Sequence, residues 1–391
     1  MKKHFKKINF DLAQQLCPPS GENNEANNFE IIKKFFGGPY IDNNGITQDI
    51  SYYKWVENDE NIKKLCEPFE VVIPSEDNNN NSDKNNNPFG VLTKHDYKCE
   101  LKLIKWITED EEHKNNFIKV GNKGTKINRH NDILPYKFNA VPLNLNIQEK
   151  NIDNYINASY IDGPFKSNEK LFIATQGPLK ETIPSFWKMI FNHKIKLVIM
   201  LSSKLEEAEG RNAIYWPKDK STPMEFINGE NKMKIEFISR EELIPDAVDL
   251  KKFKINGNFE VKQMHILCWQ DHGMPNEQNL ANDIFYKMID YIKKERENED
   301  NNNIKAPIVV HCSAGVGRTG TVIAIYVIIL CLEYLKKYKL PLIMNVFNVV
   351  RKLREQRYSL VTDTDQYQFI YDFSLDWIKK YYINNININN N

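Results

Sequence analysis

Apolar and polar side chains alternate with two different periods along this chain, which predicts helices and strands in the same fold. Residues 97–117 and 280–296 carry apolar side chains at the three-to-four-residue spacing of an amphipathic helix. Residues 319–337 are apolar on most sides, so a helix there is expected to be buried. Short β-branched runs at 197–201 and 308–310 are typical of buried strands. Together these segments predict an α/β fold.

Asparagine-rich tracts interrupt this pattern at residues 77–87, 298–303 and 384–391. They offer too few apolar side chains to build a core, so we expect linkers, loops or disorder there. Upstream of the first tract, residues 29–36 are predicted to form a short amphipathic helix without recognisable chemistry.

These tracts suggest a domain organisation. We predict an N-terminal extension of unknown role over residues 1–90, with its linker at 77–87. One main domain follows over residues 91–382, and residues 383–391 form a disordered tail.

Composition narrows the function classes. The 53 Lys and Arg residues balance 52 Asp and Glu residues, so no global charge favours nucleic acid or a membrane surface as a partner. The six cysteines form no C-x-x-C pairs, which indicates a reducing compartment rather than a disulfide framework or a zinc site. The first 30 residues lack the apolar segment of a secretion signal, and the apolar run at 322–332 is shorter than the ~20 residues that cross a bilayer. We expect a cytoplasmic protein without a membrane segment. The sequence does not indicate the oligomeric state.

One segment, residues 307–320, combines a strand, a glycine-bearing loop and a helix start in the sequence PIVVHCSAGVGRTG. Backbone N–H groups in such a loop converge on one oxyanion, and the helix N-terminus adds about half a positive charge. The residues expected to bind a phosphate in this way are Ser313, Ala314, Gly315, Val316 and Gly317.

Two side chains of the same segment carry the chemistry. Arg318 can offer two parallel donors to phosphoryl oxygens. Cys312 lies where those dipoles and Arg318 favour a thiolate, so it is the expected nucleophile, and Thr319 can hydrogen-bond its sulfur. A Cys and an Arg at this spacing also occur by chance, so the surrounding strand, His311 and the glycines are needed for the assignment.

The whole segment resembles the H-C-x5-R-[ST] signature of the Tyr-specific protein tyrosine phosphatases. Further blocks similar to that family follow in its order between about residues 95 and 380: INRHNDILP at 127–135, YINASYI at 155–161, TQGP at 175–178, FWKM at 186–189 and YWP at 215–217. The resemblance implies a highly twisted mixed sheet flanked by helices, with the phosphate loop between a strand and a buried helix. It also makes residues 91–382 the expected catalytic domain.

The resemblance implies an activity as well: hydrolysis of phosphotyrosine in proteins through a phosphocysteine on Cys312, without a metal or another cofactor. The segment WQDHGMP at 269–275 resembles the family's lid and makes Asp271 the general acid and then the base. The segment TDTDQYQF at 362–369 gives Gln366 the role of orienting the hydrolytic water.

A carboxylate is expected to fix the guanidinium of Arg318. Glu206 falls where the family has a glutamate that pairs with this arginine, and Glu207 or Glu209 are the alternatives.

Three positions depart from the family's pattern. His130 replaces a tyrosine that walls the phosphotyrosine pocket, which makes selectivity over phosphoserine less secure. Gln270 replaces a proline of the lid, so the lid is expected to open more often. Thr362 replaces a glutamine that reaches the hydrolytic water, so breakdown of the phosphocysteine is expected to slow. Asp132 is retained and can accept backbone N–H groups of a bound peptide.

Two other hypotheses stay open. The same cradle in a slow enzyme would be a phosphotyrosine-binding module. A shallower pocket would admit phosphoserine or phosphoinositides, although residues 313–317 contain no Lys to favour a lipid headgroup.

Overall fold

The computed structural model describes residues 69–70, 97–109, 114–119, 124–145, 154–165, 170–210, 212–228, 231–271, 273–275, 277–297 and 305–383. The helix expected at 29–36, most of the extension and its linker, the tract at 298–303 and the tail from 384 lie outside these residues. The predicted division into extension, domain and tail therefore stays a prediction.

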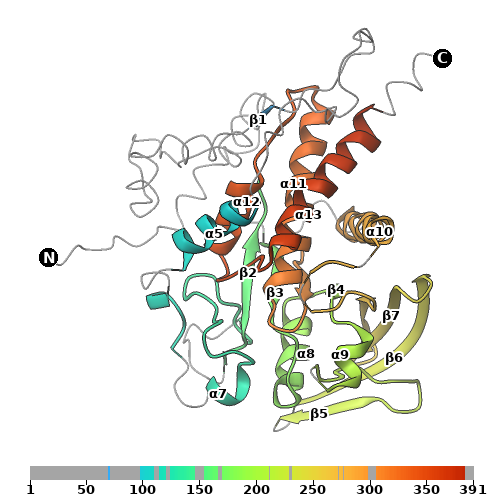
Figure 1. Cartoon of the computed structure of the whole chain (residues 1–391). Coiled ribbons are helices and arrows are strands. Elements are labelled where there is room, and N and C mark those ends of the chain that lie inside the picture. Colours follow the sequence, from blue (N-terminus) through green and yellow to red (C-terminus); the bar gives the residue numbers. More distant parts are fainter. Residues whose placement is uncertain are drawn as a thin grey trace, which may run out of the picture.

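An eight-stranded sheet organises the described part of the chain (Figure 1). Its strands, in spatial order, are β2 (Ala158–Asp162), β3 (Lys170–Thr175), β9 (Ile308–His311), β4 (Leu197–Met200), β8 (Phe259–Ile266), β7 (Val248–Ile255), β6 (Asn231–Ile244) and β5 (Met224–Asn228). Neighbours from β3 to β8 are parallel, and the remaining pairs are antiparallel. The sheet is therefore mixed.

Both faces of the sheet are covered because the central strands are apolar on both sides. Alternate residues of the same strand enter different clusters: Phe172 and Ala174 join one, whereas Ile173 joins the other. The first cluster is closed by α5 (Tyr97–Thr108), α10 (Gln278–Glu297), α11 (Gly317–Lys337), α12 (Val346–Arg354) and α13 (Thr364–Ile378). The second is closed by α8 (Ile183–Asn192). The predicted α/β fold is confirmed.

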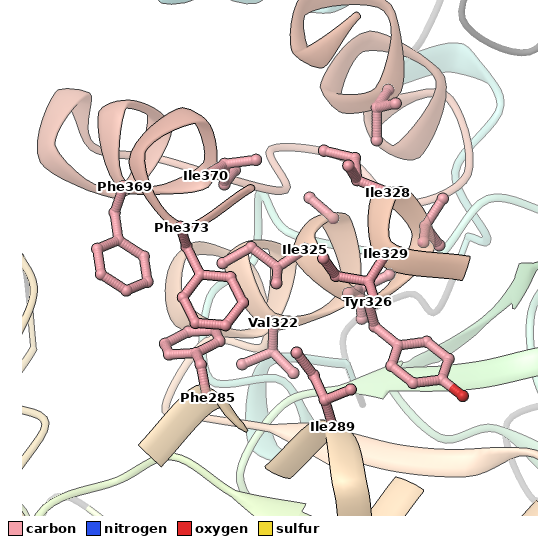
Figure 2. Close-up of a cluster of buried hydrophobic side chains, with 14 of the residues drawn as sticks. Phe285, Ile289, Val322, Ile325, Tyr326, Ile328, Ile329, Phe369, Ile370 and Phe373 are labelled. Carbon is pink, nitrogen blue, oxygen red and sulfur yellow. The ribbon is translucent and has the colours of Figure 1, made fainter. Parts of the chain in front are cut away.

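Helix α11 is the centre of the larger cluster. Figure 2 shows its apolar side chains between those of α10 and α13, with Phe285 beside Phe373. By length and composition this helix could also cross a membrane, but 78% of its apolar stretch is buried inside the protein. Its burial in this way is what the sequence predicts for residues 319–337.

Short elements complete the described chain. They are α7 (Gly124–Ile127), the 3₁₀ turn η3 (Lys180–Thr182), α9 (Lys204–Ala208), the π-helical turn η4 (Lys379–Ile383), and the paired strands β1 (Phe69–Glu70) and β10 (Ile343–Met344). Since β1 belongs to the predicted extension, at least this piece of the extension pairs with the domain.

The prediction of one helix over residues 97–117 was wrong at its C-terminal end, because α5 ends at Thr108. The sequence continues with Glu109, Asp110, Glu111 and Glu112, and acidic side chains are unfavourable at the negative end of a helix. Phe117 instead forms a single antiparallel bridge with Tyr136.

Candidate active site

The phosphate loop, residues 312–316, joins β9 to α11 in the middle of the fold. Strand β9 lies between β3 and β4, which run parallel to it, and the carboxyl ends of such strands are the usual place for a ligand in α/β folds. Because one end of the loop continues a central strand and the other a buried helix, its backbone has little freedom to shift.

Cys312 is buried, with 3% of its surface exposed. Its sulfur accepts the Gly315 N–H at 3.3 Å and the Thr319 hydroxyl at 3.3 Å. Donors that converge on a sulfur stabilise the thiolate over the thiol, and the thiolate is the nucleophilic form. The geometry therefore suits a reactive cysteine.

Gly315 is required by the shape of the loop. Its φ is +73°, and a Cβ atom there would lie 2.1 Å from the Thr175 carbonyl oxygen. Only glycine combines this left-handed backbone with so close an approach. The loop thus packs directly on the end of β3.

Arg318 is 1% exposed and is held from several sides. Its Nη1 donates to Glu206 Oε2 at 2.6 Å, and its Nη2 donates to Glu206 Oε1 at 2.8 Å. Nη1 also donates to the carbonyl oxygens of Leu201 and Trp269, each at 2.9 Å. The guanidinium is thereby fixed in one plane beside Cys312, as two-pronged binding of a phosphoryl group requires.

Glu206 is placed by the start of α9. Ser203 caps this helix, since its hydroxyl accepts the Glu206 N–H at 3.3 Å while the Glu206 carboxylate accepts the Ser203 N–H at 2.9 Å. Burial alone would raise the pKa of Glu206, but the hydrogen bonds and charge of Arg318 outweigh burial and lower that pKa. Of the alternatives, Glu207 lies 3.2 Å from His265 Nε2, and Glu209 is exposed.

The predicted lid lies close to the loop. Trp269 is fully buried and donates its indole N–H to the Gly273 carbonyl oxygen at 3.0 Å. This folded turn brings Asp271 Oδ1 to 2.9 Å from Arg318 Nη2. Asp271 takes this position although the adjacent lid residue is Gln270 rather than proline.

Thr362 and Gln366 pack on the first residue of α11. A Cβ atom on Gly317 would lie 2.5 Å from Thr362 Oγ1 and 3.0 Å from Gln366 Oε1. The Thr362 backbone N–H donates to Gln366 Oε1 at 3.4 Å. Both side chains therefore lie beside the phosphate loop, Gln366 being 1% exposed.

The predicted pocket wall lies at the surface. His130 and Asp132 are both exposed. Their segment is tied to the site through its neighbour Arg129, whose N–H donates to Gln176 Oε1 at 3.0 Å and whose Nη2 donates to the Gly177 carbonyl at 3.2 Å. The structure thus gathers the loop, Arg318, Glu206, Asp271 and Gln366 at one point, with His130 and Asp132 on the rim.

His311 supports the loop from behind. Its Nδ1 lies 3.1 Å from the Cys312 carbonyl oxygen and its Nε2 lies 2.8 Å from the Tyr215 hydroxyl. Burial lowers the pKa of His311 to about 4, so the ring is neutral at physiological pH. A neutral ring keeps this pair of hydrogen bonds without adding a charge.

Two buried residues at the site were missed by sequence reasoning. Arg357 contacts the back of the loop, and the Tyr215 hydroxyl holds His311. Tyr215 lies in the YWP block, which marks the region but not the contact. Arg357 follows Arg354 at a three-residue spacing, a pattern equally typical of a solvated helix face. Among the described residues there is no group of three His, Cys, Asp or Glu side chains placed to hold a metal.

Comparison with known sequences agrees with this geometry. The family model described as "Protein-tyrosine phosphatase" matches residues 125–376. Tyrosine-protein phosphatase non-receptor type 20 of Rattus norvegicus is 33% identical over 249 residues, which cover 64% of this chain and 53% of the relative. Receptor-type tyrosine-protein phosphatase eta of Homo sapiens is 34% identical over 252 residues, 64% of this chain and 17% of the relative. The chain spans about half the length of these curated relatives, or less.

Solved structures give the same picture. The catalytic domain of human protein tyrosine phosphatase non-receptor type 18 superimposes with a TM-score of 0.60 at 26% identity, over 72% of this chain and 95% of that chain. A structure titled for the same phosphatase in complex with HER2 phosphopeptides gives a TM-score of 0.58 at 26% identity, over 72% and 92% of the two chains. The predicted fold, a twisted mixed sheet with helices on both sides, is confirmed.

Proposed function

Because this chain belongs to the protein-tyrosine phosphatase family, we propose that it hydrolyses phosphotyrosine in proteins with Cys312 as the nucleophile. The observation that carries the proposal is the convergence on Cys312. Its sulfur accepts two hydrogen bonds at 3.3 Å, and the guanidinium beside it is held in a fixed plane by Glu206. This arrangement suits the capture of a tetrahedral dianion next to a thiolate.

In the first step the Cys312 thiolate attacks phosphorus and the bond from phosphorus to the tyrosine oxygen breaks. Charge on the transferring group is stabilised by the loop N–H groups and by Arg318. Asp271 gives its proton to the departing phenolate. Its position 2.9 Å from Arg318 Nη2 supports this role, because a phosphoryl group bound to Arg318 would be within its reach.

In the second step a water attacks the phosphocysteine, and the bond from phosphorus to sulfur breaks. Asp271, now a carboxylate, accepts the proton of the water. Gln366 orients the water, a role supported by its burial against Gly317. Inorganic phosphate and the Cys312 thiolate are regenerated.

Partners and place follow from the same proposal. Phosphotyrosine-containing proteins are the substrates, neither a metal nor another cofactor takes part, and residues 91–382 form the catalytic domain. We place the protein in the cytoplasm, which agrees with its non-receptor relatives, although receptor-type phosphatases also match.

Rapid-mixing hydrolysis of a phosphotyrosine peptide tests the proposal. The wild type should turn over with and without EDTA, and Cys312→Ser should not, while Cys99→Ser, which alters an exposed cysteine, should keep full activity. Tight peptide binding without turnover by the wild type would instead establish the binding module. Equal hydrolysis of phosphoserine or phosphoinositide substrates would establish the broader phosphatase.

A further inference from the structure

Three carbonyl oxygens of the phosphate loop, those of Ala314, Gly315 and Val316, are held by one later segment, residues 357–361. Arg357 Nε donates to the Gly315 carbonyl oxygen at 2.8 Å, and Arg357 Nη2 donates to that of Ala314 at 3.3 Å. The Val361 N–H donates to the Val316 carbonyl oxygen at 3.2 Å. Since the N–H and carbonyl of a peptide point in opposite directions, carbonyls fixed at the back turn the N–H groups toward the phosphate side.

Arg357 uses its whole guanidinium in this support. Besides the two loop carbonyls, Nη1 donates to Ser159 Oγ at 3.2 Å and Nη2 donates to Asn157 Oδ1 at 2.9 Å. The side chain is fully buried. Arg357 therefore bridges the loop to β2 and the residue before it.

The charge of Arg357 is unusual in its surroundings. Within the described residues no carboxylate pairs with it, whereas Arg354, equally buried, forms an ion pair with Glu109. Burial lowers the pKa of Arg357 to about 10. A group with that pKa is still charged at pH 7, and the residue whose carbonyl it contacts, Gly315, donates its own N–H to Cys312 Sγ at 3.3 Å.

The backbone around this contact is strained and firmly held. Ser359 and Val361 have φ values of 64° and 63°, which a β-branched residue such as valine rarely adopts. Arg354 Nη1 donates to the carbonyl oxygens of Leu360 and Val361, at 3.0 and 3.1 Å. A strained backbone of this kind persists only where the surrounding contacts hold it, so residues 357–361 are held firmly against the loop.

We propose that Arg357 is a positioning residue of this site. It holds the carbonyl oxygens of Ala314 and Gly315, so that the N–H groups of Gly315 and Val316, which share those two peptide planes, face Cys312 and the phosphoryl group. It also places a buried positive charge behind the loop, on which the Cys312 thiolate depends. This inference rests on the proposed function and adds to it a second arginine, which acts through the loop and does not touch the substrate.

The test compares Arg357→Met with the matched control Arg354→Met, which removes an equally buried arginine that contacts residues 360 and 361 but not the loop. The measurements are tungstate binding by calorimetry and the pH dependence of Cys312 alkylation by iodoacetamide. Arg357→Met should weaken tungstate binding about tenfold and raise the alkylation midpoint by about one pH unit. Arg354→Met loosens residues 360 and 361 but leaves both Arg357 contacts to the loop in place. It should lower the melting temperature, weaken tungstate binding less than Arg357→Met does, and leave the alkylation midpoint unchanged.

A second pair of variants, Arg357→Lys and Arg354→Lys, covers the case in which methionine prevents folding. Lysine keeps the positive charge but lacks the several donors of the planar guanidinium. Arg357→Lys should therefore keep the alkylation midpoint and still bind tungstate more weakly than the wild type. Alkylation and tungstate binding in either Arg357 variant identical to those of its Arg354 counterpart would overturn the inference. Both readouts are independent of turnover: a wild type that binds tungstate but hydrolyses no phosphopeptide would refute only the proposed function.

Discussion

Glu206 and Arg318 meet as two parallel hydrogen bonds, 2.6 and 2.8 Å long, between side chains that are 3% and 1% exposed. A pair this well buried is costly to break from one side, because the remaining charge has no water to replace its partner. The carboxylate therefore fixes where a phosphoryl group can bind, although it would not touch that group.

Glu206→Gln should lower kcat/KM for a phosphotyrosine peptide about 100-fold, because the amide leaves the guanidinium of Arg318 misaligned and without its buried carboxylate partner. The matched control is Glu207→Gln, which alters the next carboxylate of α9, near His265 rather than Arg318. Steady-state kinetics of both variants measure whether kcat/KM falls only when Glu206 is changed. Equal losses would show that α9 itself, and not the Glu206 pair, matters.

Asp271→Asn should slow the first step about 100-fold or more for a phosphotyrosine peptide, since an amide cannot protonate the phenolate. The loss should be smaller for a nitrophenyl phosphate, whose leaving group needs no proton. Stopped-flow measurement of phosphocysteine formation checks the difference. A uniform loss with both substrates would argue against a general acid at this position.

Gly315→Ala should abolish tungstate binding, because its methyl group would fall 2.1 Å from the Thr175 carbonyl oxygen. Gly257→Ala is the control: its φ is +76°, but nothing lies within 4 Å of the added atom. It should cost only about 1 kcal/mol of unfolding free energy and leave binding intact. Calorimetry measures tungstate binding and thermal unfolding measures stability in both variants. Together they distinguish the steric clash at residue 315 from the cost of a positive φ, which both positions share.

Thr362→Gln should raise the steady-state rate relative to the initial burst, by about tenfold, if the longer amide reaches the water that attacks the phosphocysteine. Gln366→Ala should have the opposite effect and leave the burst amplitude unchanged. Burst kinetics with a nitrophenyl phosphate measure both phases. An unaltered ratio in Thr362→Gln would mean that Thr362 already serves this step.

Stability should fall with decreasing pH partly through His311. Burial lowers its pKa from 6.5 to about 4, so in that window the unfolded chain binds a proton that the folded protein does not. The contribution reaches about 1.4 kcal/mol per pH unit. Urea unfolding of His311→Asn should show a shallower decline between pH 6.5 and 4 than the wild type. Between pH 7 and 8 the free-energy difference between the two should stay constant, and a slope there would contradict the assignment.

The sequence predicted best those elements whose pattern is uniform. Strands β4 and β9 are short β-branched runs and α11 is apolar on most sides, so burial alone explains them. Strand β6 was missed because its sequence, NKMKIEFISREELI, mixes charges with apolar residues, and its partners β5 and β7 are needed to hold it extended. Antiparallel pairing with the strands on either side, rather than an apolar pattern of its own, keeps β6 extended.

The same distinction applies to the site. Cys312 begins the phosphate loop and Arg318, six residues later, lies in the first turn of α11, so a local motif carries both. Arg357 and the Gly315 carbonyl that it contacts are 42 residues apart, and nothing near Arg357 distinguishes it from a surface arginine. Contacts of that kind form only when the tertiary fold brings the two segments together, and neither segment alone carries a sequence pattern that predicts the contact.

The phosphate loop continues a central strand at one end and a core helix at the other, whereas His130, Gln270 and Thr362 lie on the loops that surround it. A change within the phosphate loop must be accommodated by the tightly packed interior, whereas His130 and Gln270 are exposed and Thr362 is half-buried. The three unusual residues of this chain therefore alter the pocket wall, the lid and the water-orienting loop around a phosphate loop that keeps its own contacts.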